Sequence, residues 1–246
     1  MRPLRHRLTA TIAAVGTGGL LWSAHHHGLR ALPASAHLSP QRTVEGVVGS
    51  KQAAVERSLS KSFARGGLRW PARRLALLAL KAERRFEVWG RADGGWVPLK
   101  AYPILAASGG PGPKLREGDG QVPEGIYEVE NLNPNSSFYL SIRVNYPNRE
   151  DRKLAAAEKR ARLGGDIYIH GNAVSIGCIA LGDAAIEEVF VMAALAKRPI
   201  PILIAPRDFR AAPPTPNDSA AGPRWLKVRY EALAAALDAF KAQPPP

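Results

Sequence analysis

The chain has 246 residues, of which 46% are hydrophobic and 22% charged, and it contains one cysteine. This length allows one sizeable domain with extensions or two small ones, and the composition excludes global disorder and a collagen-like repeat. A single cysteine excludes an internal disulfide and a cysteine-rich zinc cluster. The net charge of +13 predicts attraction to polyanions such as nucleic acid, lipid headgroups or an anionic cell envelope, without choosing among them.

Residues 1–36 have the pattern of an export signal. Three arginines precede an apolar run from Leu8 to Trp22, which is shorter than the roughly 20 residues of a membrane span. A small-residue triplet, residues 34–36, follows. The pattern predicts a secretory signal peptide, with an uncleaved membrane anchor as the alternative. We therefore expect the rest of the chain to be exported to the periplasm, with membrane contact only through this segment.

Residues 37–72 are polar and contain one helical pattern. Val55, Leu59 and Phe63 recur every four residues, which gives a helix one apolar stripe, and Gly66-Gly67 ends it. We interpret this stretch as an N-terminal helical and polar segment.

Strand patterns dominate residues 73–207. Apolar runs predict strands near 75–80, 85–89, 96–102, 126–130, 138–144, 166–170, 178–181 and 201–205. Asp93-Gly94-Gly95 and Asn133-Pro134-Asn135 are typical of turns between strands. Residues 108–125 are rich in glycine and proline, which predicts a long loop; such loops inside domains tend to be functional or disordered.

Helical patterns occur at three places after this loop. Residues 149–162 predict an exposed helix, and Asp183 is placed to cap a second helix that Pro199 stops. From residue 208 a proline-rich linker leads to a C-terminal helix at 225–241. The predicted fold class is therefore α+β, mainly β with packed helices.

One pair of residues carries the chemistry. His170 is the only histidine beyond residue 37, and Cys178, the only cysteine, follows eight residues later. If the two flanking segments pair as an antiparallel hairpin, opposed α-carbons lie about 4.5–5.5 Å apart, and imidazole and thiol can meet. A cysteine attacks as its thiolate, and an adjacent imidazolium would hold the pKa of Cys178 below its usual value of about 8.5.

Acyl transfer also needs donors for a developing oxyanion. Gly177 lets backbone N–H groups turn toward an attacked carbonyl, Ser175 can orient the imidazole or line the pocket, and a backbone carbonyl can hold the other ring nitrogen of His170. The alternative is a purely structural pair, with Cys178 as a small buried hydrophobe. No metal site is expected, because His170 and Cys178 lack a third ligand.

The sequence resembles the L,D-transpeptidase (YkuD-type) family. His170-Gly171 followed by the Ser-Ile-Gly-Cys of 175–178 is similar to that family's catalytic motif. Residues 116–127 resemble the family's EGD…TPEG-x-Y segment, and residues 132–136 and 145–148 resemble the YafK-like murein branch. The resemblance covers residues 75 to about 206. Ile176 and Ala180 stand where many members have histidine and arginine.

This resemblance implies a β-rich catalytic domain over residues 73–207 that acts on peptidoglycan stem peptides without a cofactor. It implies Cys178 as the nucleophile, His170 as the general acid and base, and the amides of Gly177 and Cys178 as the oxyanion hole. The candidates for substrate contact are Arg116, Tyr146, Arg149 and Asn172, with Lys114 and Arg143 as further basic side chains for stem carboxylates.

Several functions remain open at this level. A Cys178 thioester resolved by an amine gives a cross-link, whereas water gives a carboxypeptidase or amidase outcome. A wall-binding protein that keeps the fold without catalysis is a further alternative. Nucleic acid is suggested only by the charge, and no recognition helix or aromatic ladder accompanies it, so we expect no nucleic-acid partner. The sequence predicts no oligomeric state.

Overall fold

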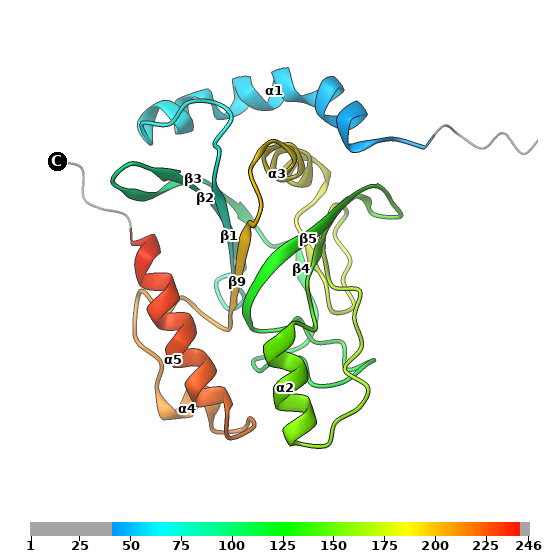
Figure 1. The fold of residues 1–246 in the computed structure, drawn as a ribbon, viewed down its shortest axis with the longest axis vertical. Coiled ribbons are helices and arrows are strands. Elements are labelled where there is room, and N and C mark those ends of the chain that lie inside the picture. The colour runs from blue at the N-terminus through cyan, green and yellow to red at the C-terminus, as the bar shows by residue number, and fades with distance from the viewer. Residues whose placement is uncertain (1–40, 242–246) are drawn as a thin grey trace, which may run out of the picture. The chain divides into compact units, whose positions relative to one another are not determined.

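A computed structural model describes residues 41–241, in which a curved sheet is flanked by helices (Figure 1). The elements in chain order are α1 (Val44–Arg65), β1 (Leu75–Leu80), β2 (Arg85–Ala92), β3 (Gly95–Pro103), β4 (Ala106–Ala107), β5 (Gly125–Ser136), β6 (Tyr139–Val144), α2 (Arg149–Ala157), β7 (Tyr168–His170), β8 (Ile179–Ala180), α3 (Asp183–Leu195), β9 (Pro201–Ala205), α4 (Pro216–Ser219), α5 (Leu226–Leu237) and the 3-10 turn η1 (Asp238–Phe240). The predicted signal or anchor at residues 1–36 lies outside the described residues.

The strands of this part of the chain form a nine-stranded sheet in the order β3-β2-β1-β9-β5-β6-β7-β8-β4. The pairs β1–β9 and β7–β8 are parallel, and the other neighbours are antiparallel. The mixed sheet with its helices confirms the expected α+β fold class. None of the helices between residues 41 and 241 is long and apolar enough to cross a membrane.

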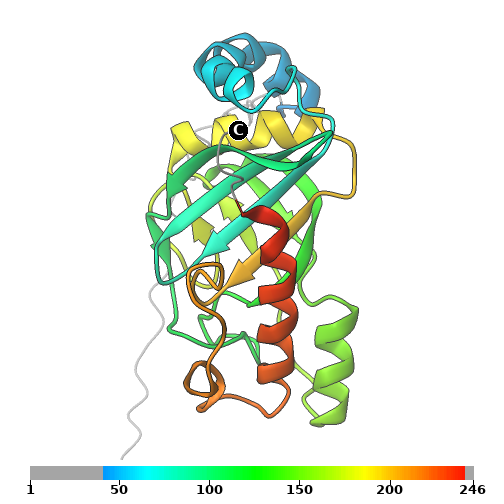
Figure 2. The ribbon, with the colours of Figure 1, turned by 90° about the vertical axis from the view of Figure 1, so that its left-hand side faces the viewer.

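Strand β1 is apolar throughout because both of its faces are covered. Leu75 and Leu77 pack in the core that includes α1 and α3, whereas Leu78 and Leu80 pack with α5. Burying each of these leucines contributes about 2 kcal/mol. Figure 2 shows α1 (blue) stacked on α3 (yellow), with α5 (red) in front of the strands.

Helix α1 confirms the predicted apolar stripe. Val55, Leu59 and Phe63 are buried, and the chain leaves the helix at Gly66. At the other end the Thr43 side chain accepts a hydrogen bond from the Gly46 amide, which satisfies one of the unpaired N–H groups of the first turn.

The predicted turn at Asn133-Pro134-Asn135 is wrong. Strand β5 runs through it to Ser136, and the chain reverses between Ser136 and Tyr139. The pairing register shifts between Asn133 and Ser136, so Pro134 lies in an irregular stretch where no ladder donor is required.

Helix α2 is shorter than the predicted 149–162. Asn148 and Asp151 form a reciprocal capping box at its start, and the backbone turns left-handed at Lys159, where φ is +55°. Helix α2 is also not wholly exposed as predicted, because Asp151 is buried and pairs with Arg229 of α5 at 2.9 Å.

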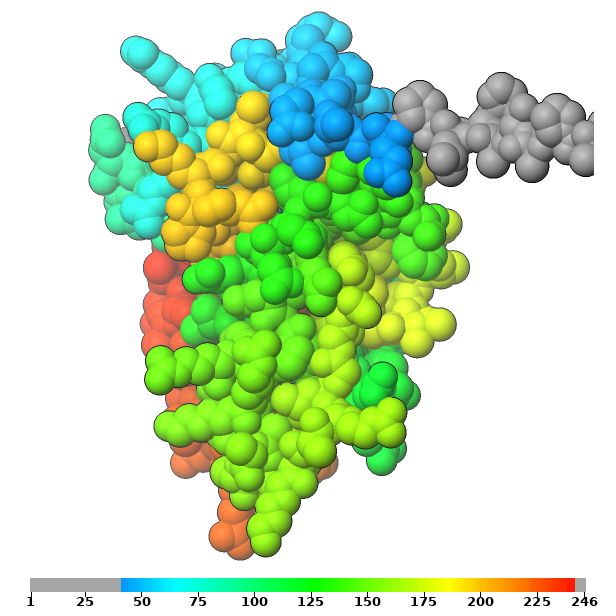
Figure 3. All heavy atoms as spheres, turned by 45° about the vertical axis from the view of Figure 1, so that its right-hand side comes forward, coloured from blue at the N-terminus to red at the C-terminus, as the bar shows by residue number. Residues whose placement is uncertain are grey.

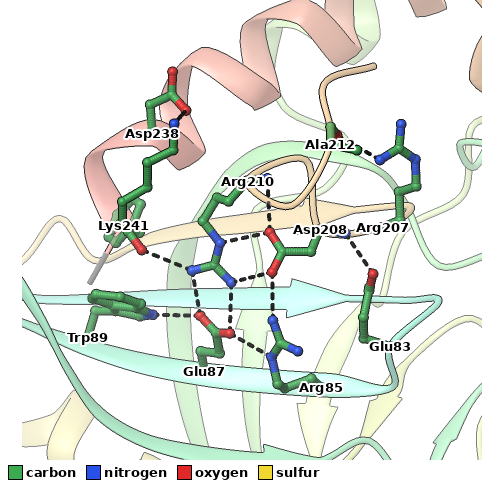
Figure 4. Close-up of polar contacts among 11 residues, drawn as sticks. Glu83, Arg85, Glu87, Trp89, Arg207, Asp208, Arg210, Ala212, Asp238 and Lys241 are labelled. Carbon is green, nitrogen blue, oxygen red and sulfur yellow. Dashed lines mark hydrogen bonds and ion pairs between the residues drawn. The ribbon is translucent and has the colours of Figure 1, made fainter. Parts of the chain in front are cut away.

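The segment after β9 is fastened to the sheet by a cluster of charges (Figure 4). Arg210 pairs with Glu87 of β2 and with Asp208, each at 2.8 Å, and Arg85 reaches Asp208 at 2.6 Å. Burial would raise the pKa of both carboxyl groups, but Arg210 and Arg85, with the Trp89 N–H at Glu87 and the Arg210 amide at Asp208, together outweigh it and hold the pKa values below their usual range.

Residues 41–241 lie within one compact unit, so α1 and α5 belong to the same folded body as the sheet. We keep residues 73–207 as the proposed extent of the catalytic domain, with 37–72 and 208–246 as flanking segments, of which residues 41–72 and 208–241 are described and pack on it.

Candidate active site

His170 is the last residue of β7 and is 1% exposed. Its ring stacks on that of Phe138, with ring centroids 4.6 Å apart. Nδ1 lies 2.6 Å from the carbonyl oxygen of Gly171. A carbonyl only accepts, so this contact requires the proton on Nδ1 and leaves the Nε2 lone pair free. Burial lowers the pKa of His170, which keeps the imidazole neutral near pH 7.

Cys178 immediately precedes β8, and the predicted antiparallel hairpin around it is wrong. Strands β7 and β8 are parallel, with His170 opposite Ala180. Extending this register by one pair beyond Ile169 and Ile179 places Cys178 beside Tyr168, two residues back from His170 on the same face. With a strand spacing of about 4.8 Å and a rise of about 3.3 Å per residue, the α-carbons of His170 and Cys178 are roughly 8 Å apart.

The thiol of Cys178 is held by backbone groups in this structure. Its Sγ lies 3.6 Å from the carbonyl oxygen of Asp166, to which it donates. Burial has the largest effect and raises the pKa of the thiol. The Tyr168 amide and Lys114 lower this pKa, the Asp166 carboxylate raises it, and the net direction is upward. The expected depression of this pKa by an imidazolium is therefore wrong for the free protein, because His170 is neutral and the thiol is turned to Asp166.

Two serine hydroxyls hold the loop that precedes the thiol. Ser175 Oγ accepts from the Cys178 amide at 3.1 Å and donates to the Cys178 carbonyl at 2.6 Å. The Gly177 amide donates to Ser108 Oγ, which itself donates to the Gly120 carbonyl at 2.8 Å. Both amides of the expected oxyanion hole thus have hydroxyl partners. Ser175 organises this loop and makes no described contact with the imidazole.

Gly177 and Gly171 are required at their positions for different reasons. Gly177 has φ of +92°, in the region that disfavours a side chain. Gly171 lies so close to its neighbours that a Cβ would meet Asp183 Oδ1 at 2.5 Å and the Phe138 carbonyl at 2.7 Å.

The predicted helix cap at Asp183 is wrong. Asp183 is the first residue of α3, and Gly182 is the cap. The Asp183 carboxylate instead accepts a hydrogen bond from the Asn172 amide at 2.8 Å.

We expect Gly171→Ala to lower the free energy of unfolding by about 2 kcal/mol, because the added methyl would overlap the Phe138 carbonyl and the Asp183 side chain of α3. Urea unfolding followed by circular dichroism measures this loss. Gly165→Ala is the matched control, since the nearest atom to its Cβ is 4.0 Å away. Equal midpoints for the two variants would show that Gly171 is not sterically required.

The predicted substrate-contact residues are dispersed. Tyr146 is buried, and its hydroxyl donates to the backbone, so its position favours a structural role. Arg149 is exposed in the first turn of α2. Asn172 lies next to the site with a left-handed φ of 58°. Arg116 lines a surface cavity with Leu115 and its neighbours.

Of the two further basic candidates, neither is free. Lys114 is buried and pairs with Asp119 at 2.6 Å. Arg143 pairs with Glu130 at 2.8 Å and lies over the ring of Tyr168. Both charges are already compensated by neighbouring groups.

Three residues of the site have no signal in the sequence. Ser108 belongs to the glycine-rich loop and reaches Gly177 across 69 positions of the chain. Asp166 acts through its main-chain carbonyl, which any residue type supplies. The sequence predicts Phe138 at the start of a strand, but Phe138 lies in the turn before β6, where its ring stacks on His170.

Comparison with known proteins places this site in a family. Residues 76–202, over half of the chain, match the model of YkuD, the L,D-transpeptidase catalytic domain. YafK of Escherichia coli K12 is 38% identical over 112 residues, which are 45% of this chain and 43% of that protein, and YafK of strain O157:H7 matches equally. The match thus spans less than half the length of these curated relatives.

Solved structures give weaker likenesses. The helical cell shape determining protein Pgp2 of Campylobacter jejuni has a TM-score of 0.46 at 20% identity, covering 63% of this chain and 56% of that one. Bd1075 of Bdellovibrio bacteriovorus has a TM-score of 0.41 at 22% identity, covering 68% and 55%.

Proposed function

Because this chain belongs to the YkuD family of L,D-transpeptidase catalytic domains, we propose that it is a cysteine-dependent acyltransferase that acts on peptidoglycan stem peptides. The observation that carries this proposal is the placement of His170 at the end of β7 and of Cys178 immediately before the adjacent parallel strand β8, inside the matched region.

The first step uses a neutral thiol and a neutral imidazole. The thiol leaves the Asp166 carbonyl when a substrate carbonyl enters, and Sγ attacks that carbon. Nε2 of His170 takes the thiol proton and then delivers it to the leaving amine. One S–C bond forms, one C–N bond breaks, and the product is a thioester on Cys178 with a free amine. The Gly171 carbonyl stabilises the imidazolium that exists between the two transfers.

Stabilisation of the tetrahedral intermediate requires donors at the attacked oxygen. The amides of Gly177 and Cys178 supply them when the hydroxyls of Ser108 and Ser175 rotate away. Both serines are in loops, and a hydroxyl rotates without moving the backbone.

The second step decides the outcome of the reaction. An acceptor amine at the thioester gives a cross-link, and water gives cleavage of the stem. Incubation of the protein with purified stem peptides, followed by mass analysis of the products, separates the two outcomes. Joined peptides support transpeptidation, shortened peptides support hydrolysis, and unchanged peptides contradict the proposed enzyme.

A wall-binding protein without catalysis is the second candidate. It is favoured by the contact of the thiol with Asp166, the raised pKa of Cys178 and the occupied amides of Gly177 and Cys178. Such a protein would sediment with purified peptidoglycan and leave the stems chemically unchanged. Turnover that depends on Cys178 contradicts this candidate.

Peptidoglycan lies outside the cytoplasmic membrane, so the proposal includes export by residues 1–36 to the periplasm. The net charge of +13 suits attraction to an anionic envelope. A reporter fused after residue 40 that is active only when exported tests this part, and a reporter that stays cytoplasmic contradicts it.

A further inference from the structure

A cavity of about 750 Å³ opens beside the candidate active site, between the glycine-rich loop and the segment after α2. We call it the Arg116 cavity; its lining residues are Pro113, Leu115, Arg116, Asp119, Gln121, Arg160, Ala161 and Arg162. Figure 3 shows the two segments next to each other, the loop in green and the other in yellow-green. The Glu117 amide donates to the Arg162 carbonyl at 2.9 Å, which joins them. The volume suits a small molecule or a short peptide segment.

The cavity adjoins the loop of Cys178 through shared residues. Gln121 lines the cavity, and its carbonyl oxygen lies 3.4 Å from where a Cβ of Gly177 would stand. Gly120 is bonded through Ser108 to the Gly177 amide. Gln121 therefore lies between the cavity and the segment that presents the thiol.

The charges of the cavity favour an anion. Arg116 is exposed, and within residues 41–241 its guanidinium has no hydrogen bond or ion pair. Arg162 has one long contact, 3.4 Å, with Glu117, and its side chain is 85% exposed. Arg160 donates hydrogen bonds to the Glu158 carboxylate and to the Leu115 carbonyl, so its guanidinium forms part of the cavity wall.

The one acid that lines the cavity cannot neutralise Arg116. Asp119 accepts hydrogen bonds from Lys114 and from the amides of Leu115, Arg116 and Gln121. Burial would raise the pKa of Asp119, but these donors outweigh it and hold the pKa below its usual range. The carboxylate is saturated by groups of its own loop, which leaves the Arg116 guanidinium available to a ligand.

We propose that the Arg116 cavity binds a carboxylate of the peptide whose carbonyl Cys178 attacks, with the aliphatic part of that residue against Pro113, Leu115 and Ala161. This inference rests on the proposed function, whose substrate it makes more specific. Arginine suits the role because its planar fork donates two parallel hydrogen bonds to a carboxylate.

The test measures binding apart from turnover. Isothermal titration of the Cys178→Ala protein uses a tetrapeptide stem with free carboxylates and the same peptide with every carboxyl group amidated. We expect amidation to weaken binding about tenfold, the effect of losing a charge-assisted hydrogen bond. Adding Arg116→Gln should weaken binding of the free-carboxylate peptide by a similar factor and make the two peptides equivalent.

Arg152→Gln is the matched control, since it removes an equal charge from the exposed face of α2, outside the cavity. It should preserve the preference for the carboxylate. Equal binding of both peptides, equal effects of the two arginine variants, or no binding of either peptide at millimolar concentration overturns the inference. Selective binding without turnover by the wild-type protein instead overturns the proposed function and leaves the cavity assignment standing.

Discussion

Replacing Cys178 by alanine is expected to lower turnover of stem peptides by about 10⁴-fold or more, because no other thiol in the chain can form the acyl intermediate. The fold should tolerate the change, since Cys178 is only partly buried and its thiol makes a single weak contact with a backbone carbonyl. Turnover is measured from product formation by mass analysis, and folding from the urea midpoint.

Cys178→Ser is the informative companion variant. It replaces the thiol with a hydroxyl of similar size that can also form hydrogen bonds, but an alcohol is far less ionised than a thiol near pH 7. It should therefore fold normally and lose nearly as much turnover as the alanine variant. Turnover retained by either well-folded variant would remove Cys178 from the mechanism.

Replacing His170 by glutamine is expected to lower turnover by about 10²- to 10⁴-fold, the range of general acid–base catalysis, and to leave the ionisation of the free thiol almost unchanged. The second half of this expectation follows from the structure. Burial lowers the pKa of His170 and raises that of Cys178, so both groups are neutral in the free protein near pH 7.

The pH dependence of iodoacetamide labelling at Cys178 measures this ionisation. Labelling requires the thiolate, so its rate should increase with pH through a midpoint above the usual value of about 8.5. The midpoint should agree between wild type and His170→Gln within about half a unit. A wild-type midpoint below 8.5 that moves upward in the variant would demonstrate a preformed thiolate–imidazolium pair and contradict the neutral resting state.

The sequence predicts much of the fold because the signals are local. The continuous apolar run of Leu75–Leu80 and the four-residue spacing of Val55, Leu59 and Phe63 each reflect the faces that their elements bury. The turn at Asn133-Pro134-Asn135 failed because the same residues fit an irregular stretch of β5, and only its pairing with β6 distinguishes the two.

The candidate site was predictable in its residues and not in its geometry. His170 and Cys178 stand out by their rarity and by the motif that they share with the family. The loop between them is long enough for either strand direction, and the parallel arrangement is fixed by remote partners: β7 pairs with β6, and β8 pairs with β4. The role of Ser108 depends on a contact with Gly177 that no local pattern encodes.

The contacts of charged residues are likewise not predictable from the sequence. Arg116, Lys114 and Arg143 are alike in sequence as candidates for a stem carboxylate. Only the folded chain shows that Lys114 is paired with Asp119 and Arg143 with Glu130, whereas Arg116 faces a cavity without a partner.

Trapping the acyl-enzyme tests the central claim most directly. Wild-type protein is mixed with a stoichiometric amount of stem peptide, quenched in acid at successive times and analysed by intact-protein and peptide mass spectrometry. We predict a transient mass increase equal to the peptide minus its leaving amine, located on Cys178 and absent from Cys178→Ala. Product that forms in a single turnover with no acyl group on Cys178 at any time, and equally in the alanine variant, would contradict the thioester mechanism.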